Sequence, residues 1–327
     1  MKKELYSVFS WLVDSKALYI ALAISFLLAL FLKSSLFGIL TAIFLLLGLI
    51  AEIYVGLQRG GVKNELKETA IALLIAVVIW FGASFILSVP SPLNAVVSCS
   101  MLPELQVGDM ILLQGGEPSA PVAQISDSAI AKINDRLAVT VSAPGIGTLG
   151  VPNGIYPYCT NIANYNKPIC ILFTTHPEQI IEHRGPLDFK FEACERINFN
   201  NTRYLIPCTR TVSINAMEFK TNFSTSVIVY NAPRDQLFGA QGDIIHRVIV
   251  KLKTENGSTY YLTKGDNNPI FDLQAFSSSY ELGNNLAPSM AYKGKMIARH
   301  PYLGYFKMFL FGRFSGGEGC DSTFTTN

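Results

Sequence analysis

The sequence has few charged residues and little net charge. Asp, Glu, Lys and Arg make up 15% of its 327 residues, whereas soluble domains contain about 25%. The 26 basic and 24 acidic side chains leave a net charge of +2, which is too small to indicate a nucleic acid as the partner. Hydrophobic residues make up 50%, so the chain can bury ample surface and is not expected to be disordered. The composition therefore argues against an ordinary cytosolic protein.

Three long apolar runs near the N-terminus explain the low charge. They are residues 17–32, 36–57 and 70–89, and the one charge within them is Glu52. Each run is close to the roughly 20 residues that a helix needs to cross a bilayer. We therefore expect three N-terminal transmembrane helices that form a membrane anchor over residues 1–89. A cleaved signal peptide at residues 17–32 is the alternative, and it is disfavoured because two further apolar runs follow directly.

The basic residues around these runs predict their orientation. Most lie before the first run or in the second loop, and one lies in the first loop: Lys2, Lys3 and Lys16, then Arg59, Lys63 and Lys67, against Lys33. Short cytoplasmic loops carry an excess of Lys and Arg, so residues 90–327 are expected outside the cytoplasm. Glu52 is a functional candidate as an intramembrane acid, but it lies about one turn from the inner end of its helix. We interpret it as a residue that reaches the interface.

All six cysteines lie in this outer region: Cys99, Cys159, Cys170, Cys194, Cys208 and Cys320. An even number of cysteines outside the cytoplasm favours disulfides. Zinc is the rival interpretation, but the spacings contain no C-x-x-C pair. Three pairings of the middle four cysteines stay open. Asn200, Asn222 and Asn256 stand in glycosylation sequons that are usable on this side of the membrane.

The outer region is expected to be mostly β. Short runs rich in Ile, Val, Leu, Thr and Tyr alternate with Gly, Pro and Asn clusters, at residues 109–114, 136–141, 226–230, 243–253 and 258–262. No helical period of comparable length is present. We therefore predict a compact, β-rich domain with a minor α component over residues 90–327.

One hairpin in this domain can be predicted in more detail. Asn256-Gly257 is a strong hairpin signal, because both residues of a two-residue turn need positive φ. The alternation of the preceding strand places His246 on the apolar face. A histidine there is usually a hydrogen-bonded core residue, but the returning strand brings Asp266 and Asp272 near the ring. With a two-residue turn Asp266 points to the opposite face, and Asp272 is freer to reach the ring unless a bulge changes the register.

Four ordered motifs resemble signal peptidase I, the membrane-anchored serine endopeptidase that removes signal peptides. The matching segments are Ser98-Cys99-Ser100-Met101-Leu102-Pro103 followed by Gly108-Asp109, Gly242-Asp243-Ile244-Ile245-His246-Arg247-Val248, Thr263-Lys264-Gly265-Asp266-Asn267-Asn268 with Asp272, and Gly294-Lys295-Met296 with Pro301-Tyr302-Leu303-Gly304-Tyr305. A histidine stands where bacterial members carry a lysine base. The chain is therefore more similar to the archaeal and endoplasmic-reticulum type.

The resemblance implies a role for each motif residue. Ser100 would be the nucleophile, His246 the general base and Asp272 the acid that orients it, with Asp266 as a supporting acid. Ser98 and the backbone N–H of Ser100 would form the oxyanion hole. The resemblance also implies a small, mostly β peptidase core that cleaves signal-peptide-bearing precursors after small residues, with no cofactor and no metal.

The same resemblance predicts where the protein acts. The partners would be precursor proteins and the lipid bilayer, with accessory membrane subunits or a translocon left open. The resemblance leaves the host membrane open, but three spans with a large insertion favour a multi-pass protein of an archaeal cell membrane, with the endoplasmic reticulum membrane and a lumenal domain as the alternative. Ser100 follows Val89 by about eleven residues, at most roughly 36 Å of extended chain, so the site is expected near the bilayer surface.

Three features depart from the family pattern. Cys99 replaces the usual glycine between the two motif serines, which raises the question of a cysteine nucleophile, although Ser100 occupies the nucleophile position. The chain between the serine and histidine motifs is unusually long, and we expect a disulfide-bearing insertion within residues 116–222. Three spans precede the first motif where many members have one. The alternatives are an inactive membrane-anchored β domain that binds partners, and a protease of the same clan with a dedicated substrate.

Overall fold

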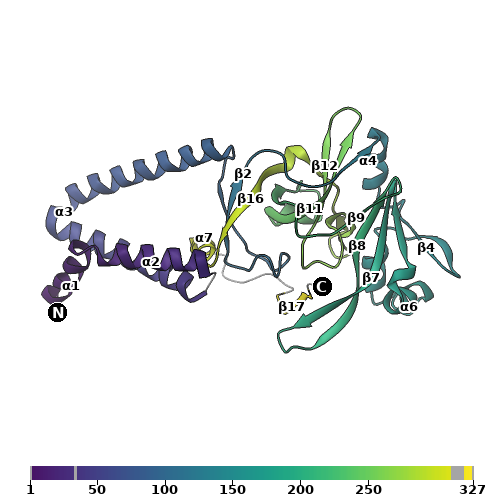
Figure 1. Cartoon of the computed structure of the whole chain (residues 1–327), viewed down its shortest axis with the longest axis horizontal. Helices are drawn as coiled ribbons and strands as arrows, with labels where there is room; N and C mark the ends of the chain where they lie inside the picture. The colour runs from purple at the N-terminus through teal and green to yellow at the C-terminus, as the bar shows by residue number, and fades with distance from the viewer. Residues whose placement is uncertain (1, 33–34, 311–319, 326–327) are drawn as a thin grey trace. The chain divides into compact units, whose positions relative to one another are not determined.

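The apolar N-terminal segment is helical. The computed structural model describes residues 2–32, 35–310 and 320–325. Helix α1 covers Lys2–Asp14, α2 covers Ala17–Leu32 and α3 covers Ser35–Leu87 (Figure 1). No proline interrupts this segment, and its Leu, Ile, Ala and Phe side chains suit a helix whose backbone groups are satisfied internally.

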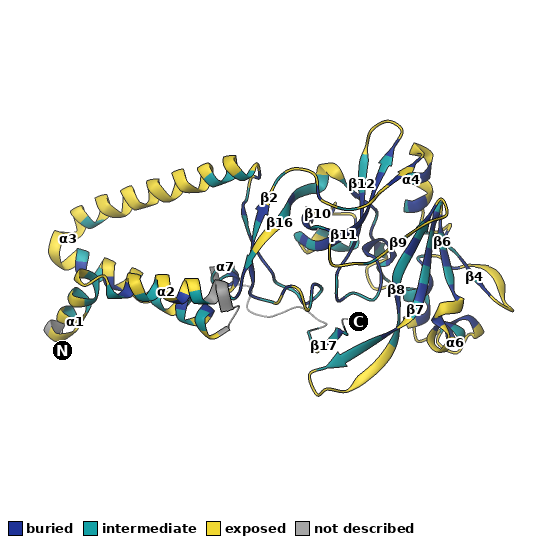
Figure 2. Ribbon diagram, viewed as in Figure 1, coloured by how far each residue is buried: buried dark blue, intermediate teal, exposed yellow. Residues whose placement is uncertain are grey.

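One described helix, Leu36–Leu87, is long and apolar enough to span a membrane. Many apolar side chains of its second half are exposed, and Phe85 is 86% exposed (Figure 2). A contiguous apolar surface of this kind indicates apolar surroundings. Helices α1 and α2 are short and bent by 58° at their junction. Three separate spans therefore stay a prediction.

The difference from the expected three helices has a local cause. Residues 58–69 were expected to form a loop, but they are helical apart from Gly61, whose φ of 67° and ψ of 169° break the helix. Arg59 pairs with Asp14 of α1 at 2.5 Å, which ties the break to the first helix. Glu52 accepts a hydrogen bond from the Tyr19 hydroxyl of α2.

The chain divides into two units, and the first contains the helices together with two later segments, Gln106–Gly115 and residues 297–310. Strands β1 (Leu93–Ala95) and β2 (Met110–Gln114) pair in it, and helix α7 covers Gly304–Leu310. The Gly304 N–H donates to the Gly108 carbonyl at 2.8 Å. A Cβ at Gly108 would lie 2.1 Å from the Tyr305 ring, so two of the quoted motifs require glycine at this close approach.

The second unit contains residues 98–105, 116–296 and 320–325. Its first sheet has the antiparallel order β16–β10–β11–β12–β15, and β3 runs parallel to the end of β11. The strands are β3 (Val122–Ile125), β10 (Val227–Asn231), β11 (Asp243–Thr254), β12 (Thr259–Lys264), β15 (Ala287–Pro288) and β16 (Tyr292–His300), of which the first residues pair with β10. Short elements complete this region: η2 (Leu237–Ala240), η3 (Asp272–Gln274), η4 (Ser289–Ala291), β13 (Phe276–Ser277) and β14 (Leu282–Gly283).

The predicted two-residue turn between β11 and β12 is wrong. The Thr254 carbonyl accepts a hydrogen bond from the Gly257 N–H, and the Thr254 N–H donates to the Ser258 carbonyl. The turn therefore contains the three residues between Thr254 and Ser258. The Asn256 carboxamide accepts from the Ser258 N–H at 2.8 Å and holds this longer turn. A bulge between Val248 and Val250 then shifts the register once more. Hydrogen bonding by the asparagine side chain decided the turn type here.

A second sheet occupies residues 140–220, within the range expected for the insertion. Its order is β5–β4–β6–β7–β8–β9, and β17 pairs with β7. The strands are β4 (Thr140–Ala143), β5 (Gly147–Gly150), β6 (Ile181–Arg184), β7 (Leu187–Asn198), β8 (Arg203–Ile214), β9 (Met217–Lys220) and β17 (Ser322–Phe324). Helices α4 (Asp127–Asn134), α5 (Ile155–Thr160) and α6 (Pro168–Thr175) and the turn η1 (Pro177–Gln179) flank it.

The two sheets share one hydrophobic core. Phe189 and Val212 of the second sheet are buried with Val250 and Leu262 of the first sheet and with Phe271. The Phe189 and Phe271 ring centroids are 5.3 Å apart. The expectation of a mostly β domain is therefore confirmed. Four of the five expected strands are found within two residues of their predicted ends, whereas residues 136–141 overlap β4 in two residues because a turn precedes it.

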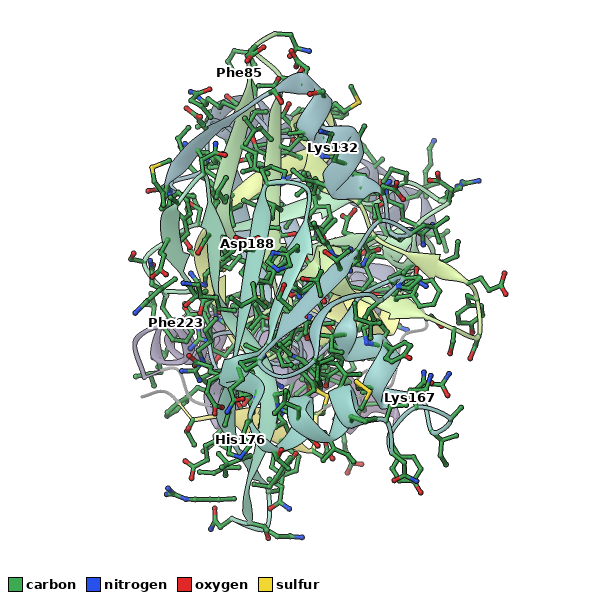
Figure 3. All side chains as sticks on the ribbon, turned by 90° about the vertical axis from the view of Figure 1, so that its right-hand side faces the viewer. Phe85, Lys132, Lys167, His176, Asp188 and Phe223 are labelled. Carbon is green, nitrogen blue, oxygen red and sulfur yellow. A yellow bond between two sulfur atoms is a disulfide. The ribbon has the colours of Figure 1, made fainter. Side chains whose placement is uncertain are left out.

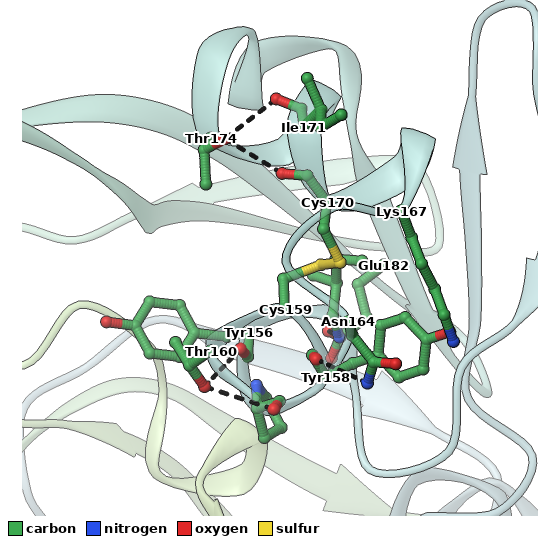
Figure 4. Close-up of a disulfide and its surroundings, with 12 residues drawn as sticks. Tyr156, Tyr158, Cys159, Thr160, Asn164, Lys167, Cys170, Ile171, Thr174 and Glu182 are labelled. Carbon is green, nitrogen blue, oxygen red and sulfur yellow. Dashed lines mark hydrogen bonds between the residues drawn. A yellow bond between two sulfur atoms is a disulfide. The ribbon is translucent and has the colours of Figure 1, made fainter. Parts of the chain in front are cut away.

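The expected disulfides are present in three pairs. Cys159–Cys170 joins α5 to α6 (Figure 4), Cys194–Cys208 joins β7 to β8, and Cys99–Cys320 joins residues 221 positions apart. The middle four cysteines thus pair with their neighbours in sequence. Because Cys99 is in a disulfide, its sulfur is not a thiol in this structure.

Candidate active site

Ser100, His246 and Asp272 form one hydrogen-bonded chain within the second unit. The Ser100 Oγ lies 2.9 Å from His246 Nε2, and His246 Nδ1 lies 2.7 Å from Asp272 Oδ2. Ser100 lies in a turn that continues through Met101. His246 lies on β11, and Asp272 lies at the start of η3. The structure thus brings together three residues that the sequence separates by 146 and 26 positions.

The environment of Asp272 favours the ionised carboxylate. Burial alone would raise its pKa, but His246 and the hydroxyls of Thr263 and Tyr230 outweigh burial and lower the pKa below its ordinary value. Thr263 Oγ1 donates to Oδ2 at 2.6 Å and the Tyr230 hydroxyl donates at 2.9 Å. A carboxylate held in this way can stabilise a protonated imidazole and fix its orientation.

Asp266 lies apart from the histidine. Its two oxygens accept hydrogen bonds from Arg247 at 2.8 and 2.7 Å, in a bidentate pair whose side chains are both at most 5% exposed. Arg247 also donates to the Thr225 carbonyl at 2.6 Å. Asp266 therefore makes no hydrogen bond to the ring among the described residues, and its supporting role stays a prediction.

Ser98 lies beside the candidate nucleophile. Its Oγ is 3.2 Å from the Ser100 Oγ, and both residues are half-buried. A hydroxyl at this distance from the attacking oxygen can donate to an oxyanion that forms there. The oxyanion hole of Ser98 and the Ser100 N–H stays a prediction.

Asn267 anchors the turn that carries Ser100. Its N–H donates to the Ser100 carbonyl at 2.8 Å, and its side-chain amide donates to the carbonyls of Cys99 (3.2 Å) and Ser322 (3.0 Å). Arg196 of β7 donates to the Asn267 Oδ1 at 3.1 Å. The Cys99–Cys320 disulfide reinforces the same connection, so β17 and the second sheet both hold the serine turn.

Gly265 lets the two loops approach each other. A Cβ at this position would lie 2.7 Å from the Ser100 carbonyl oxygen, which is shorter than real contacts allow. The third motif therefore requires glycine because Ser100 approaches it closely. Its backbone φ does not require glycine, because it lies outside the left-handed region.

The loop that carries Asp272 is held by a buried polar network from the second sheet. Arg184 of β6 pairs with Glu182 at 2.8 Å and donates to the Leu273 carbonyl at 2.9 Å. Gln274 donates to Glu182 at 3.3 Å, and all three charged or amide side chains are at most 1% exposed. Nothing in the sequence pattern singled out Glu182, Arg184 or Arg196, because their role depends on the packing of two sheets.

A second Ser–His–Asp chain was also missed from the sequence. Ser142 Oγ lies 2.8 Å from His183 Nε2, and His183 Nδ1 lies 2.7 Å from Asp188 Oδ1. These residues come from β4, β6 and β7, and Asp188 is labelled on the second sheet in Figure 3. The His183 and Asp188 side chains are 31% and 46% exposed.

Comparison with known proteins adds no relative. No protein-family model matches the chain, and no curated protein matches it in sequence.

Proposed function

We propose that the protein is a membrane-bound serine endopeptidase of the signal peptidase I type, which removes signal peptides from precursor proteins after small residues. The observation that carries the proposal is the hydrogen-bonded chain from the half-buried Ser100 through the buried His246 to the buried Asp272, built from the residues of three separate motifs. A nucleophile in contact with a base that a third group orients is the general arrangement for acyl transfer.

The proposed reaction follows from this arrangement. His246 Nε2 takes the proton of the Ser100 hydroxyl while Oγ attacks the scissile carbonyl. The tetrahedral oxyanion accepts hydrogen bonds from Ser98 and the Ser100 N–H. The imidazolium then gives its proton to the leaving amine, and the acyl-enzyme remains. His246 next takes a proton from a water molecule as its oxygen attacks the ester. The ester C–O bond then breaks, and the imidazolium returns the proton to the Ser100 Oγ.

The proposal places the enzyme in a membrane with three spans, at about residues 17–32, 36–57 and 70–89. The catalytic domain would lie outside the cytoplasm, facing the lipid bilayer and precursors that are inserted in it. The long apolar helix and the disulfides are consistent with this location. We favour an archaeal cell membrane over the endoplasmic reticulum membrane.

The test is cleavage of a fluorescent precursor with an apolar segment and an Ala-x-Ala site, by the full chain in liposomes. We expect cleavage after the second alanine by the natural protein and none by Ser100→Ala. If the folded, inserted protein labels with a serine-directed acylating probe but does not cut this precursor, it is a protease with a dedicated substrate. If it neither cuts nor labels, it is a binding domain and the proposal is wrong.

A further inference from the structure

A pocket of about 90 Å³ lies in the second unit behind the loop that anchors Ser100. Its wall includes Arg210 of β8, Phe223, Arg247 of β11, Lys264 of β12, Asp266 and Phe324 of β17. Phe223, labelled in Figure 3, is an exposed ring at the pocket. The volume is several times what one enclosed water molecule needs, so the pocket can hold a small polyatomic group.

Two of the charged residues in the wall neutralise each other. Arg247 and Asp266 form the bidentate pair described above, and the remaining Arg247 donors reach the carbonyls of Phe223 (3.0 Å) and Thr225 (2.6 Å). This pair contributes no net charge to the pocket. Arg210 and Lys264 therefore decide the sign of the pocket.

Lys264 is a buried ammonium without a counter-ion among the described residues. It is 6% exposed, and its hydrogen-bond acceptor there is the Asn268 carbonyl at 2.5 Å. An ammonium has three donors, so two have no protein acceptor in this part of the chain. Burial lowers the pKa of Lys264 to about 8; the charges of Asp266 and Asp272 oppose this shift, and those of Arg210 and Arg196 add to it. A buried cation of this kind is costly unless a negative charge accompanies it.

The neighbouring arginines increase the positive charge. Arg210 meets Glu192 at 3.5 Å through its Nε, and both side chains are partly exposed, so the pair is screened by solvent. Arg196 donates to the Asn267 amide and the Ser322 carbonyl, which are neutral. Both Arg196 and Lys264 lie over the Phe324 ring, at 4.7 and 5.8 Å from its centroid.

We propose that this pocket binds a small oxyanion, a phosphate or carboxylate group, between Lys264 and Arg210. An ammonium and a guanidinium are the usual partners of such groups, and the buried Phe324 ring in the wall limits the access of water that would weaken the attraction. The anion supplies the negative charge that Lys264 lacks. This inference does not depend on the proposed protease activity.

The position of the pocket gives the anion a structural effect. Gly265 and Pro103 also line it, and Gly265 is in close contact with the Ser100 carbonyl. An anion bound to Lys264 therefore holds the start of the loop that positions the serine turn. Its occupancy should stabilise the folded protein.

The test is thermal unfolding of the full chain in a neutral detergent, with inorganic phosphate added at constant ionic strength. We expect a saturable rise in Tm, and at a phosphate concentration of about ten times Kd the folded-to-unfolded ratio should increase about 11-fold. Lys264→Met keeps the length of the side chain without its charge and should abolish the response. Lys251→Met is the matched control, because Lys251 is a buried lysine that has a carboxylate partner, Glu117, at 3.1 Å.

A second variant and a second phosphate source complete the test. If Lys264→Met does not fold, Arg210→Gln replaces it, since Arg210 is partly exposed. Nanodiscs of phosphatidylcholine with and without phosphatidic acid separate a lipid headgroup from free phosphate. Stabilisation by either source that Lys264→Met or Arg210→Gln removes supports the site. No saturable response to either source, or an unchanged response in these variants, overturns it.

Discussion

The protein contains two Ser–His–Asp chains with nearly the same distances and very different surroundings. The hydrogen bonds are 2.9 and 2.7 Å in Ser100–His246–Asp272, and 2.8 and 2.7 Å in Ser142–His183–Asp188. Distances therefore do not distinguish them. Burial does, because the His246 and Asp272 side chains are 5% and 3% exposed, whereas those of His183 and Asp188 are 31% and 46% exposed.

The backbone around each serine differs as well. Ser142 lies on β4, between Thr148 of the edge strand β5 and Ile181 of β6, so its backbone takes part in a strand ladder. Ser100 lies in a turn whose carbonyl is held by Asn267. Hydrogen-bond donors that stabilise the oxyanion in acyl transfer are worth more in a site that excludes water. The second chain is best explained as a set of cross-strand hydrogen bonds.

Replacement of the two serines should separate the chains most strongly. Ser100→Ala removes the attacking oxygen, and we expect precursor cleavage to fall by about 10⁶-fold. Ser142→Ala should leave the rate unchanged. Initial rates in liposomes measure both. Equal losses in the two variants would contradict the assignment of Ser100.

Replacement of the two acids should give the next largest difference. Asp272→Asn keeps the shape but removes the charge that orients and stabilises the imidazolium, and a loss on the order of 10³–10⁴-fold is expected. Asp188→Asn should have no effect on kcat. A pH–rate profile of each variant checks that the change lies in the ionisation of the base. An active Asp272→Asn variant would mean that Asp266 or another acid orients His246.

A methyl group at Gly265 should disturb the serine turn. Because its Cβ would meet the Ser100 carbonyl at 2.7 Å, Gly265→Ala must displace one of the two loops. We expect kcat to fall by about 10²-fold, the usual cost of a small misplacement. The control is Gly150→Ala, on an exposed edge strand near the Ser142–His183–Asp188 hydrogen bonds. A Cβ at this position would have no atom within 4 Å. A fully active Gly265→Ala would show that the turn can move without cost.

Removal of the disulfide beside Ser100 should lower activity more than removal of the Cys159–Cys170 disulfide, but this difference should be smaller than the preceding ones. Removal of Cys99–Cys320 in a Cys99→Ala/Cys320→Ala variant should lower activity by about 10-fold, since Asn267 still holds the turn. Cys159→Ala/Cys170→Ala should lower the stability, by about 2–4 kcal/mol, with little change in kcat. Activity at a temperature where both variants are folded makes the comparison. Equal kcat values would separate the Cys99–Cys320 bond from the active site.

Acid stability should give the smallest contrast. The folded-state pKa of Asp272 is lowered, so its contribution to stability is present above the unfolded pKa and is lost as the pH falls through the folded value. Asp272→Asn should therefore flatten the acid side of the stability curve. Urea unfolding at several pH values measures this. If the free energy of unfolding fell equally with decreasing pH in Asp272→Asn and in the natural protein, the predicted contribution of Asp272 would be contradicted.

The sequence predicted the β-rich domain and the residues of the buried chain, but not the contacts that hold them. The predicted hairpin had the wrong turn and lacked a bulge, yet Asp272 reaches His246 because it lies beyond the strand end and its position does not depend on the register. Arg184 and Arg196 could not be predicted, since they act across two sheets. The pairing of Cys99 with Cys320 was equally inaccessible, because it joins the ends of the second unit.

That last disulfide has a consequence for the order of synthesis. Ser100, His246 and Asp272 are all present once residue 272 has been made, but Cys320 and β17 follow much later. A polypeptide that stops at residue 310 would contain Ser100, His246 and Asp272 but lack the Cys99–Cys320 disulfide beside the serine. The turn that carries Ser100 therefore receives its last support only after β17 has been made and has paired with β7.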